Sequence, residues 1–471
     1  MFSLGLDIGT SKVALAPTEL GTRRVVLTQS AEYPECATKV RGVQDAGALL
    51  ECAVQLVQSA LRDRSEAVSA ICVAGQMHGV VVFDSRGVPV TPLVNWQDER
   101  CNADPSFLPE LCAQTGHSLC AGFGCATLSW LYNGKDSDIT LDNECAYRCG
   151  TIMDLLVARL CGNAAAPVMD ETNAAAFGLY SPAAHDWDWA AVRAAGIPPS
   201  VLPRIVAPGS VAGLLTREAA ADLLHGASGV CAGIPVYAAA GDFQAALLAT
   251  VGDPAADIAI NIGTGGQLAA IVDAIPADPS SPSSPCALRV AGRPYEYRPF
   301  FGGRVAVTAA SLSGGSAWAW LVELLRGWLG ALGVDRSRDA LYPALDALGL
   351  EALEAPGAEG DEVLRVQPTF AGERHAPGLR GEITGITADN MGLGQLCAAL
   401  ARGVVENLRD MVPEDVLRGK SRVVASGNAI RRSRLFQNVI QRVFRLPLEV
   451  CEHAEEAAVG ASFIAGLSAG K

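Results

Sequence analysis

The sequence predicts an α/β protein made of two similar domains. Three strand-length apolar runs open the chain and lead into helix–strand units, which is the order typical of mixed α/β sheets. A short motif at the end of the first strand recurs in the second half. Half of the 471 residues are hydrophobic and only 18% are charged, which excludes a disordered chain and allows large cores.

The first elements follow from the apolar runs taken in order. We expect strands at Phe2–Asp7, Val13–Pro17 and Arg24–Thr28, joined by turns. Apolar residues at helical spacing then predict a helix over Asp45–Leu61. The short apolar run Val68–Ala74 predicts a buried strand after that helix. The first domain therefore begins with a strand-rich unit and continues as helix–strand pairs.

The second half begins with the same unit. The segment Leu6–Thr10 (LDIGT) has a counterpart in Ile260–Thr264 (INIGT), 254 positions later, and each follows and precedes an apolar strand. The apolar pattern breaks at Thr250–Asp257, so we predict domains over 1–250 and 251–471. The low-complexity stretch Pro276–Pro285 reads as a surface insertion in the second domain.

The charge balance and the cysteines limit the kind of partner. Acidic residues number 50 and basic residues 36, and no long Lys/Arg run occurs, so we expect no nucleic-acid partner. A single nucleotide stays compatible with the net charge of −14, because local backbone groups hold small anions. The 14 cysteines lack metal or CxxC spacing. With no leader-like N-terminus, we expect a cytoplasmic protein without a membrane partner.

One uncharged run, Val305–Val322, has the length of a membrane span. It contains several serines and glycines that such a span would place in lipid. A buried strand, a glycine loop and a buried helix explain the run better.

The first turn has the composition of a phosphate site. Asp7 at a strand end is followed by Gly9, Thr10, Ser11 and Lys12. Glycine lets backbone N–H groups approach phosphate oxygens, the hydroxyls and Lys12 add donors, and Asp7 could hold Mg²⁺ through water. The alternative is an ordinary hairpin turn, and the sequence is not a Walker loop.

The second turn repeats this composition with more glycine, in Thr264, Gly265 and Gly266. Two such turns at equivalent places in two halves favour a pair of cradles for a polyphosphate.

Two polar clusters follow strands of the first domain and suit a polyhydroxylated ligand. Gln76 and His78 come after the strand that ends near Gly75, and Trp96 and Asp98 lie in the loop NWQDER. A ring face can pack on an indole while hydroxyls meet carboxylates and amides. The alternatives are a structural histidine and a solvated loop.

Asp242 is the sharpest single feature of the sequence. It interrupts the apolar stretch Gly233–Gly252, where an unpaired buried charge would be costly. It either caps a helix over Phe243–Thr250 or serves as a general base that accepts the proton of an attacking hydroxyl. The two roles are compatible.

Two further glycine-containing segments, Ser313–Ser316 and Ser426–Ala429, lie at strand–loop–helix junctions. Glycine there would let a flat base or a ribose approach the backbone.

Taken together, these segments resemble the FGGY carbohydrate kinases. The match lies in the order of eight motifs, namely DIGTS, GQMHG, NWQDER, GDFQ, NIGTGG, SGGSAW, SGNAIRRSRLFQ and EEAAVGAS. The resemblance implies two ribonuclease-H-like (actin-like ATPase) domains on either side of a cleft. It also implies ATP-dependent phosphorylation of the terminal hydroxyl of a ketose, here O7 of sedoheptulose. Xylulose or ribulose is the alternative acceptor, and a catalytically silent nucleotide or sugar sensor is a further alternative.

The resemblance also implies a role for each motif residue. Asp242 would be the general base. The sugar would meet Met77, His78 and Gln244, near Gln76, Trp96 and Asp98. The transferring phosphate and Mg²⁺ would meet Asp7, Thr10 and Ser11, and other phosphates would meet Thr264, Gly265 and Gly266. The adenosine would be framed by Gly314, Gly315, Gly427 and Asn428.

The chain departs from the family pattern in the first turn. The family places a basic residue seven positions after the aspartate, and this chain has Ala14 there. Lys12 lies five positions after Asp7, which keeps the odd offset that puts a side chain on the same face of a strand. The partners expected are a small sugar and ATP, and the oligomeric state is not fixed by the sequence.

Overall fold

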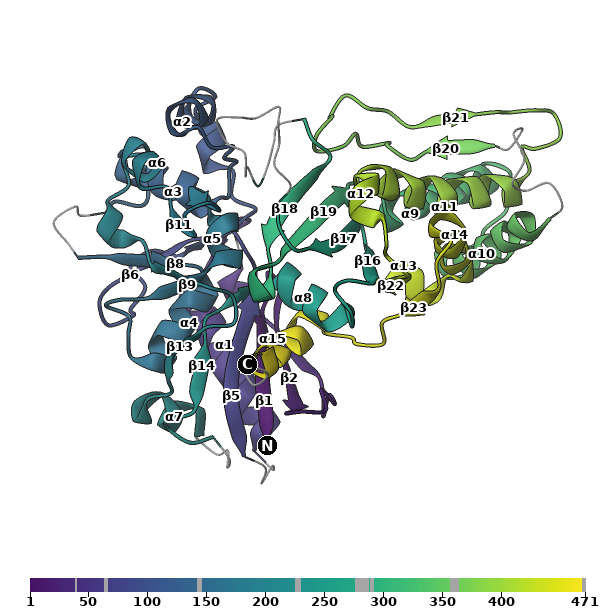
Figure 1. The fold of residues 1–471 in the computed structure, drawn as a ribbon. Coiled ribbons are helices and arrows are strands. Elements are labelled where there is room, and N and C mark those ends of the chain that lie inside the picture. Colours follow the sequence, from purple (N-terminus) through teal and green to yellow (C-terminus); the bar gives the residue numbers. More distant parts are fainter. Residues whose placement is uncertain are drawn as a thin grey trace.

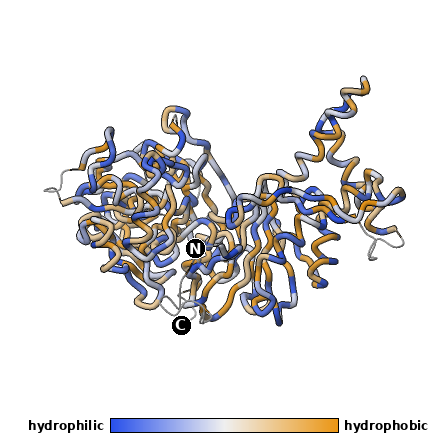
Figure 2. Tube along the Cα trace, turned by 90° about the horizontal axis from the view of Figure 1, so that it is seen from above, coloured by the Kyte–Doolittle hydropathy of each residue, from blue (hydrophilic) through white to orange (hydrophobic). Residues whose placement is uncertain are grey.

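The computed structural model describes residues 1–38, 40–62, 67–141, 146–224, 230–275, 288, 292–355 and 364–467. These residues form two large sheets, each covered by helices (Figure 1). Seen from above, the molecule consists of two bodies that lie side by side and are joined through a narrow middle (Figure 2). The predicted surface insertion at 276–285 lies outside the described residues.

The first sheet has the strand order β13–β14–β5–β1–β2–β3, and β15 joins the end of β5. Strands β1, β2 and β3 form an antiparallel meander, and β5 pairs in parallel with β1. The bounds are β1 Phe2–Ile8, β2 Lys12–Glu19, β3 Gln29–Glu32, β5 Val68–Gly75, β13 Val211–Leu214, β14 Pro235–Tyr237 and β15 Ala240–Gly241.

The predicted third strand at Arg24–Thr28 is wrong. The chain there is partly exposed and makes one isolated bridge, between Val25 and Thr18, with two further backbone hydrogen bonds to β2 but no ladder. The ladder with β2 starts at Gln29, opposite Leu15. In that register Pro17 would lie opposite Leu27, and a proline has no N–H to donate to a ladder. The strand therefore begins five residues later than the apolar run indicates.

The second sheet has the order β18–β19–β17–β16–β22–β23. The two strands that come first along the chain, β16 and β17, form an antiparallel hairpin, and β16 also pairs in parallel with β22. This repeats the pairing of β1 with β2 and β5, so the duplication predicted from the motif is present in the strand order. The bounds are β16 Asp257–Ile262, β17 Gly266–Val272, β18 Tyr295–Pro299, β19 Val305–Ser311, β22 Arg422–Ser426 and β23 Leu448–Val450.

Helices α11 to α14 contact strands of the second sheet, and α10 packs outside them on α9, α11 and α14. The uncharged run Val305–Val322 forms β19 and the start of α9, as predicted. Among the described residues, no helix has both the length and the apolar character needed to span a membrane. The bounds are α9 Gly315–Ala331, α10 Arg338–Glu354, α11 Leu393–Asp410, α12 Glu414–Leu417, α13 Asn428–Arg432 and α14 Arg434–Phe444, with the hairpin β20 Arg365–Gln367 and β21 Glu382–Thr384 beside them.

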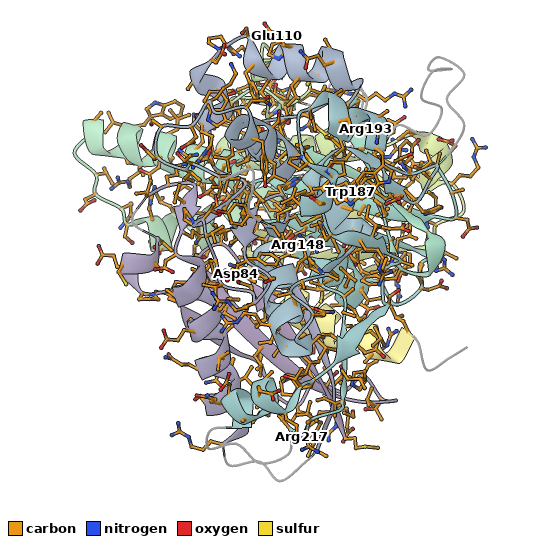
Figure 3. The ribbon with its side chains drawn as sticks, turned by 90° about the vertical axis from the view of Figure 1, so that its left-hand side faces the viewer. Asp84, Glu110, Arg148, Trp187, Arg193 and Arg217 are labelled. Atoms are coloured by element: carbon orange, nitrogen blue, oxygen red, sulfur yellow. The ribbon has the colours of Figure 1, made fainter. Side chains whose placement is uncertain are left out.

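A large insertion between β5 and β14 has its own hydrophobic core, built on buried aromatics such as Phe177 and Trp187. Figure 3 faces this side, with Glu110 of α2 at the top and Arg217 of α7 at the bottom. The helices on this side of the first body are α1 Ala46–Leu61, α2 Phe107–Thr115, α3 Gly124–Tyr132, α4 Ile152–Cys161, α5 Glu171–Phe177, α6 Trp189–Ala194 and α7 Arg217–Leu224. The small strands are β4 Val43–Gln44, β6 Val81–Phe83, β7 Leu93–Val94, β8 Arg148–Gly150, β9 Val168–Asp170, β10 Tyr180–Ser181, β11 Asp186–Trp187 and β12 Arg204–Val206.

Two helices, α8 (Asp242–Thr250) and α15 (Glu456–Leu467), lie in the middle of the molecule. They pack against each other, and α15 also packs on β1, β2 and β5, so the last helix returns to the first sheet. The helices and strands approach closely here because glycines, which have no side chain, lie at the contacts. A Cβ on Gly460 would lie 1.7 Å from the carbonyl oxygen of Ala245, and one on Gly5 would lie 2.0 Å from that of Ala458.

Candidate active site

Two carboxylates reach the same edge of the first sheet. Asp7 lies next to the end of β1, opposite Ala74 of β5. Gly241 pairs with Gly75 at the end of β5, and the following residue, Asp242, begins α8. Because these strands are parallel, their carboxyl ends meet at one edge, where α/β sheets bind ligands.

Asp7 is a carboxylate without a neutralising partner of its own. Its Oδ1 is buried and has no hydrogen bond among the described residues. Burial raises its pKa to about 8, and the nearby carboxylates of Asp242 and Glu455 add to this effect, while Lys12 opposes it. A cation at Oδ1 would remove the cost of the buried charge, so the position suits a metal ion.

Asp242 has the ionisation of a general base. Burial raises its pKa to about 6, while the N–H of Phe243 and the charge of Arg298 oppose that rise. The N–H of Phe243 donates to its Oδ1 at 2.7 Å. A base with a pKa near neutrality is efficient because it is ionised and still accepts a proton readily. The helix begins at Asp242 itself, with Gly241 as the cap residue, one position earlier than predicted.

Thr172 fixes the backbone that directly precedes Asp242, and no signal in the sequence indicates this contact. The N–H of Gly241 donates to Thr172 Oγ1 at 2.9 Å, and the hydroxyl donates to Asp170 Oδ1 at 2.6 Å. All three residues are buried. Thr172 stands at the start of α5, 70 residues before Asp242, so only the folded chain brings them together.

The first turn is held from behind by a network of side-chain amides. Gln44 Nε2 donates to the carbonyl of Thr10 at 2.9 Å, and Gln76 Nε2 donates to that of Gly9 at 3.2 Å. Gln44 Oε1 in turn accepts from Gln76 Nε2 and Asn95 Nδ2, both at 2.9 Å. The hydroxyl of Thr10 also joins the network and donates to Gln76 Oε1 at 3.3 Å, so the amides fix the shape of the turn.

The second turn is held by backbone contacts. The N–H of Gly315 donates to the carbonyl of Gly263 at 2.8 Å, and that of Ser316 to Thr264 at 2.9 Å. A Cβ on Gly314 would lie 2.3 Å from the carbonyl group of Gly265, and one on Gly265 would lie 2.7 Å from the carbonyl oxygen of Ser311. The glycines are needed here for close packing of two loops.

A pocket of about 300 Å³ runs from the start of α8 into the insertion. Met77, His78 and Gln244, three predicted sugar residues, line it. His78 is stacked on Phe123, and its Nδ1 lies 2.7 Å from the carbonyl of Ala176. Gln244 Oε1 is buried and has no partner among the described residues. These side chains can therefore offer fixed polar groups to a ligand in the pocket.

The other three predicted sugar residues take different positions. Gln76 is 2% exposed and belongs to the network behind the first turn. The indole Nε1 of Trp96 donates to Thr10 Oγ1 at 3.0 Å, so this half-exposed side chain lies over the first turn. Asp98 is buried and forms an ion pair with Arg100 at 2.8 Å. Neither pattern nor spacing distinguishes a residue that binds a ligand from one that supports its neighbour.

A second pocket, of about 690 Å³, lies in the other body beyond the second turn. Three predicted nucleotide residues, Thr264, Gly315 and Asn428, line it. Gly314 lies behind the second turn, and Gly427 packs against the carbonyl of Ile262, where a Cβ would be 2.5 Å away. The sequence reasoning missed the rest of the lining, which includes Trp318, Tyr342, Asp346, Arg432 and Phe436.

Glu373, in the segment GERHAPGL, supports the loop behind this pocket. Its carboxylate accepts from Ser311 Oγ at 2.6 Å, from the N–H of Leu312 at 3.0 Å and from Asn407 Nδ2 at 2.9 Å. The side chain is buried, so these bonds take the place of water. Glu373 thereby orders the loop that packs on Gly265.

Lys12 has a partner in the structure. Its Nζ lies 2.6 Å from Glu455 Oε1, just before α15, and its side chain is 43% exposed. The first turn is one residue longer than the second, with four residues between Ile8 and Val13 and three between Ile262 and Gly266. Lys12 is the last of those four residues.

The arrangement combines the parts that group transfer requires. Asp242, a carboxylate of suitable pKa, directly follows Gly241, which packs against the pocket residues Met77 and Gln244. Its charge acts on Asp7 at the end of β1, and the second turn lines a larger pocket in the other body. An acceptor molecule in one pocket and a phosphate donor in the other would meet near Asp7 and Asp242. No cluster of three or more His, Cys, Asp or Glu side chains that could enclose a metal is found within the described part of the chain.

Comparisons with known proteins agree with this arrangement. Residues 2–249 match the N-terminal domain of the FGGY family of carbohydrate kinases. The chain is 34% identical to the sedoheptulokinase of Mus musculus and 31% identical to that of Homo sapiens, in each case over 98% of this chain and 96% of the relative. Among solved structures, the xylulose kinase of Rhodospirillum rubrum superposes with a TM-score of 0.80 at 25% identity, covering all of this chain and 90% of that one.

Proposed function

The chain belongs to the FGGY family of carbohydrate kinases, and we propose that it transfers the γ-phosphoryl group of ATP to O7 of sedoheptulose. The protein is a carbohydrate kinase, so ATP and a sugar are its substrates. The choice of sugar rests on the full-length similarity to two relatives that are named sedoheptulokinases.

The observation that carries the reaction is the position of Asp242, which directly follows Gly241 beside the pocket residues Met77 and Gln244 and lies close enough to Asp7 to raise its pKa. In the proposed mechanism, Met77, His78 and Gln244 bind the sugar so that its terminal hydroxyl faces Asp242. The hydroxyl oxygen attacks the γ-phosphorus, the bond to ADP breaks, and the hydroxyl proton passes to the Asp242 carboxylate. Thr10 and Ser11 of the first turn and Thr264 and Gly265 of the second orient the phosphates, which is the main task in phosphoryl transfer.

A magnesium ion is part of this proposal, and Asp7 is the residue that would hold it. Its buried, unpartnered Oδ1 fits a cation. A single carboxylate also fits Mg²⁺, which keeps several waters and takes further oxygens from phosphates. The ion would supply neutralisation of the phosphate charge. Gly314, Gly315, Gly427 and Asn428 would frame the adenosine, together with the aromatic residues of the larger pocket.

The substrate assignment is tested by ADP production with sedoheptulose, xylulose, ribulose and glycerol at equal concentrations. We expect the highest kcat/KM with sedoheptulose. A higher kcat/KM with a pentulose would overturn the assignment of the sugar and leave the kinase activity intact.

The role of Asp242 is tested by Asp242→Asn, with Asp84→Asn as a control at an exposed turn that pairs with Arg86. We expect kcat to fall by about 10²–10⁴-fold, while ADP and sugar still bind. The wild-type kcat/KM should also fall tenfold per pH unit below about pH 6, because a base whose pKa is raised to about 6 is protonated there. Turnover by the variant at the wild-type rate would exclude the base.

A further inference from the structure

The pocket between the insertion of the first body and β18 of the second is longer than the reacting end of a sugar requires. Met77 and Gln244 lie at its inner end, because a Cβ on Gly241, next to Asp242, would touch both side chains at 2.7 Å. The lining continues into the insertion, to the loop 115–119 after α2 and to Asp188 before α6. Figure 1 shows α2 and α6 at the top of the first body, well away from α8 in the centre.

The far end of the pocket carries a histidine–carboxylate pair. His117 Nε2 lies 3.1 Å from Asp188 Oδ2, and the two side chains are 26% and 36% exposed. The other oxygen of Asp188 is committed to the cap of α6, where Oδ1 accepts from the N–H groups of Ala190 and Ala191. The carboxylate is therefore fixed by the helix, and it fixes the imidazole.

The pair leaves one ring nitrogen of His117 available. A carboxylate that accepts from Nε2–H selects the tautomer in which Nδ1 is an acceptor, and it orients the ring. No partner of Nδ1 is seen among the described residues. A half-buried, oriented nitrogen in a pocket wall is suited to a hydroxyl group of the ligand.

The position of this pair relative to Asp242 connects it with the length of the sugar. Every acceptor of this reaction must place its terminal hydroxyl at Asp242, so acceptors of different length differ at the opposite end. A heptulose extends two carbons farther than a pentulose from that anchor. We therefore expect the group at the far end of the pocket to be reached by the longer sugar alone.

We infer that His117, oriented by Asp188, binds a hydroxyl at the ketone end of a seven-carbon ketose and so selects it over five-carbon ketoses. This inference rests on the proposed function and deepens it. A site that hydrogen-bonds a substrate hydroxyl discriminates strongly against an analogue that leaves its polar group unpaired.

The test compares kcat/KM for sedoheptulose and for xylulose in the wild type and in His117→Ala. We expect kcat/KM for sedoheptulose to fall at least tenfold, mainly through KM, while the value for xylulose changes less than threefold. His185→Ala is the matched control, because His185 also pairs with a carboxylate, Glu171 at 3.1 Å, but is 68% exposed and outside the pocket. That variant should keep the wild-type ratio.

Asp188→Asn is a second variant that removes the carboxylate but keeps the cap of α6, since Asn caps helices as well as Asp does. We expect it to reduce the preference for sedoheptulose in the same direction, because it no longer fixes the ring. An equal loss with both sugars in His117→Ala, or an unchanged ratio, would overturn the inference. A wild type that prefers the pentulose would instead contradict the proposed function, so the two failures are distinguishable.

Discussion

The two glycine turns occupy equivalent places in duplicated sheets, yet they are stabilised in different ways. The first turn, Gly9–Lys12, is held by hydrogen bonds from the side chains of Gln44 and Gln76. The second, Gly263–Gly265, is held by backbone N–H groups of the neighbouring loop and by glycines that allow it to approach. The strand that precedes the first turn carries Asp7, and the strand that precedes the second carries Asn261.

The two turns also differ in the groups that surround them. The first turn follows a charged residue, Asp7, that lies close to Asp242, and the amides around the turn are neutral donors and acceptors. The second turn lines the larger pocket. On the strand before it, Asn261 donates to Ser426 Oγ at 2.7 Å. The two copies therefore share a backbone pattern and differ in their side chains, as the proposed roles of reaction at the first turn and nucleotide binding at the second require.

The largest effect is expected from Asp7→Asn, which gives the first turn the residue of the second. We expect kcat to fall on the order of 10²–10³-fold, because a charged group that acts on the reacting phosphate is lost. The measurement is the initial rate of ADP formation at saturating ATP and sugar.

The same variant should not lose stability. Burial raises the pKa of Asp7 to about 8 from 3.8, so ionisation disfavours the folded state as the pH rises through this window. In buffer without magnesium, the Tm of Asp7→Asn should equal or exceed that of the wild type at pH 9. A lower Tm would show that Asp7 supports the fold.

Gly314→Ala and Gly9→Ala compare the packing of the two turns. At position 314 the new methyl would lie 2.3 Å from the backbone of Gly265, and at position 9 its nearest contact is 3.1 Å, to the carbonyl of Lys12. We expect Gly314→Ala to cost about 1–3 kcal/mol of stability and to lower kcat/KM for ATP at least tenfold. Gly9→Ala should lower kcat/KM for ATP less than threefold. Equal effects of the two variants would contradict the comparison.

Gln44→Ala tests the amide network of the first turn. It removes an acceptor from Gln76 and Asn95 and a donor from Thr10. Leaving buried polar groups unpaired costs about 1–3 kcal/mol, so the denaturation midpoint should fall. The KM for ATP should rise several-fold with a smaller change in kcat. A variant with unchanged KM would show that the network supports only the fold.

The smallest effect is expected from Lys12→Ala. Lys12 is half exposed and already paired with Glu455, and such ion pairs contribute about 0–1 kcal/mol. The KM for ATP should change less than threefold. A change above tenfold would show that Lys12 leaves Glu455 and contacts phosphate, as its position in the motif suggests.

Much of the site could be placed from the sequence, because strand ends and turns are local features. The apolar runs fixed β1, β2 and β5, and the glycine turns therefore had to follow β1 and β16. Asp242 was recognisable because a lone charge in an apolar stretch requires a reason. The position of Gln76 was not recognisable, because its contacts with Gly9 and Gln44 join segments 67 and 32 residues apart.

By itself, the sequence determined the α/β class, the duplication, the family and the order of the motifs, because each of these is written in local composition and spacing. Tertiary structure alone decided which side chains support the turns and which face a pocket. It brought Thr172 to Gly241, Glu373 to Ser311 and His117 to Asp188. Such pairs form because separate segments meet around shared cores, and no periodicity along the chain records that meeting.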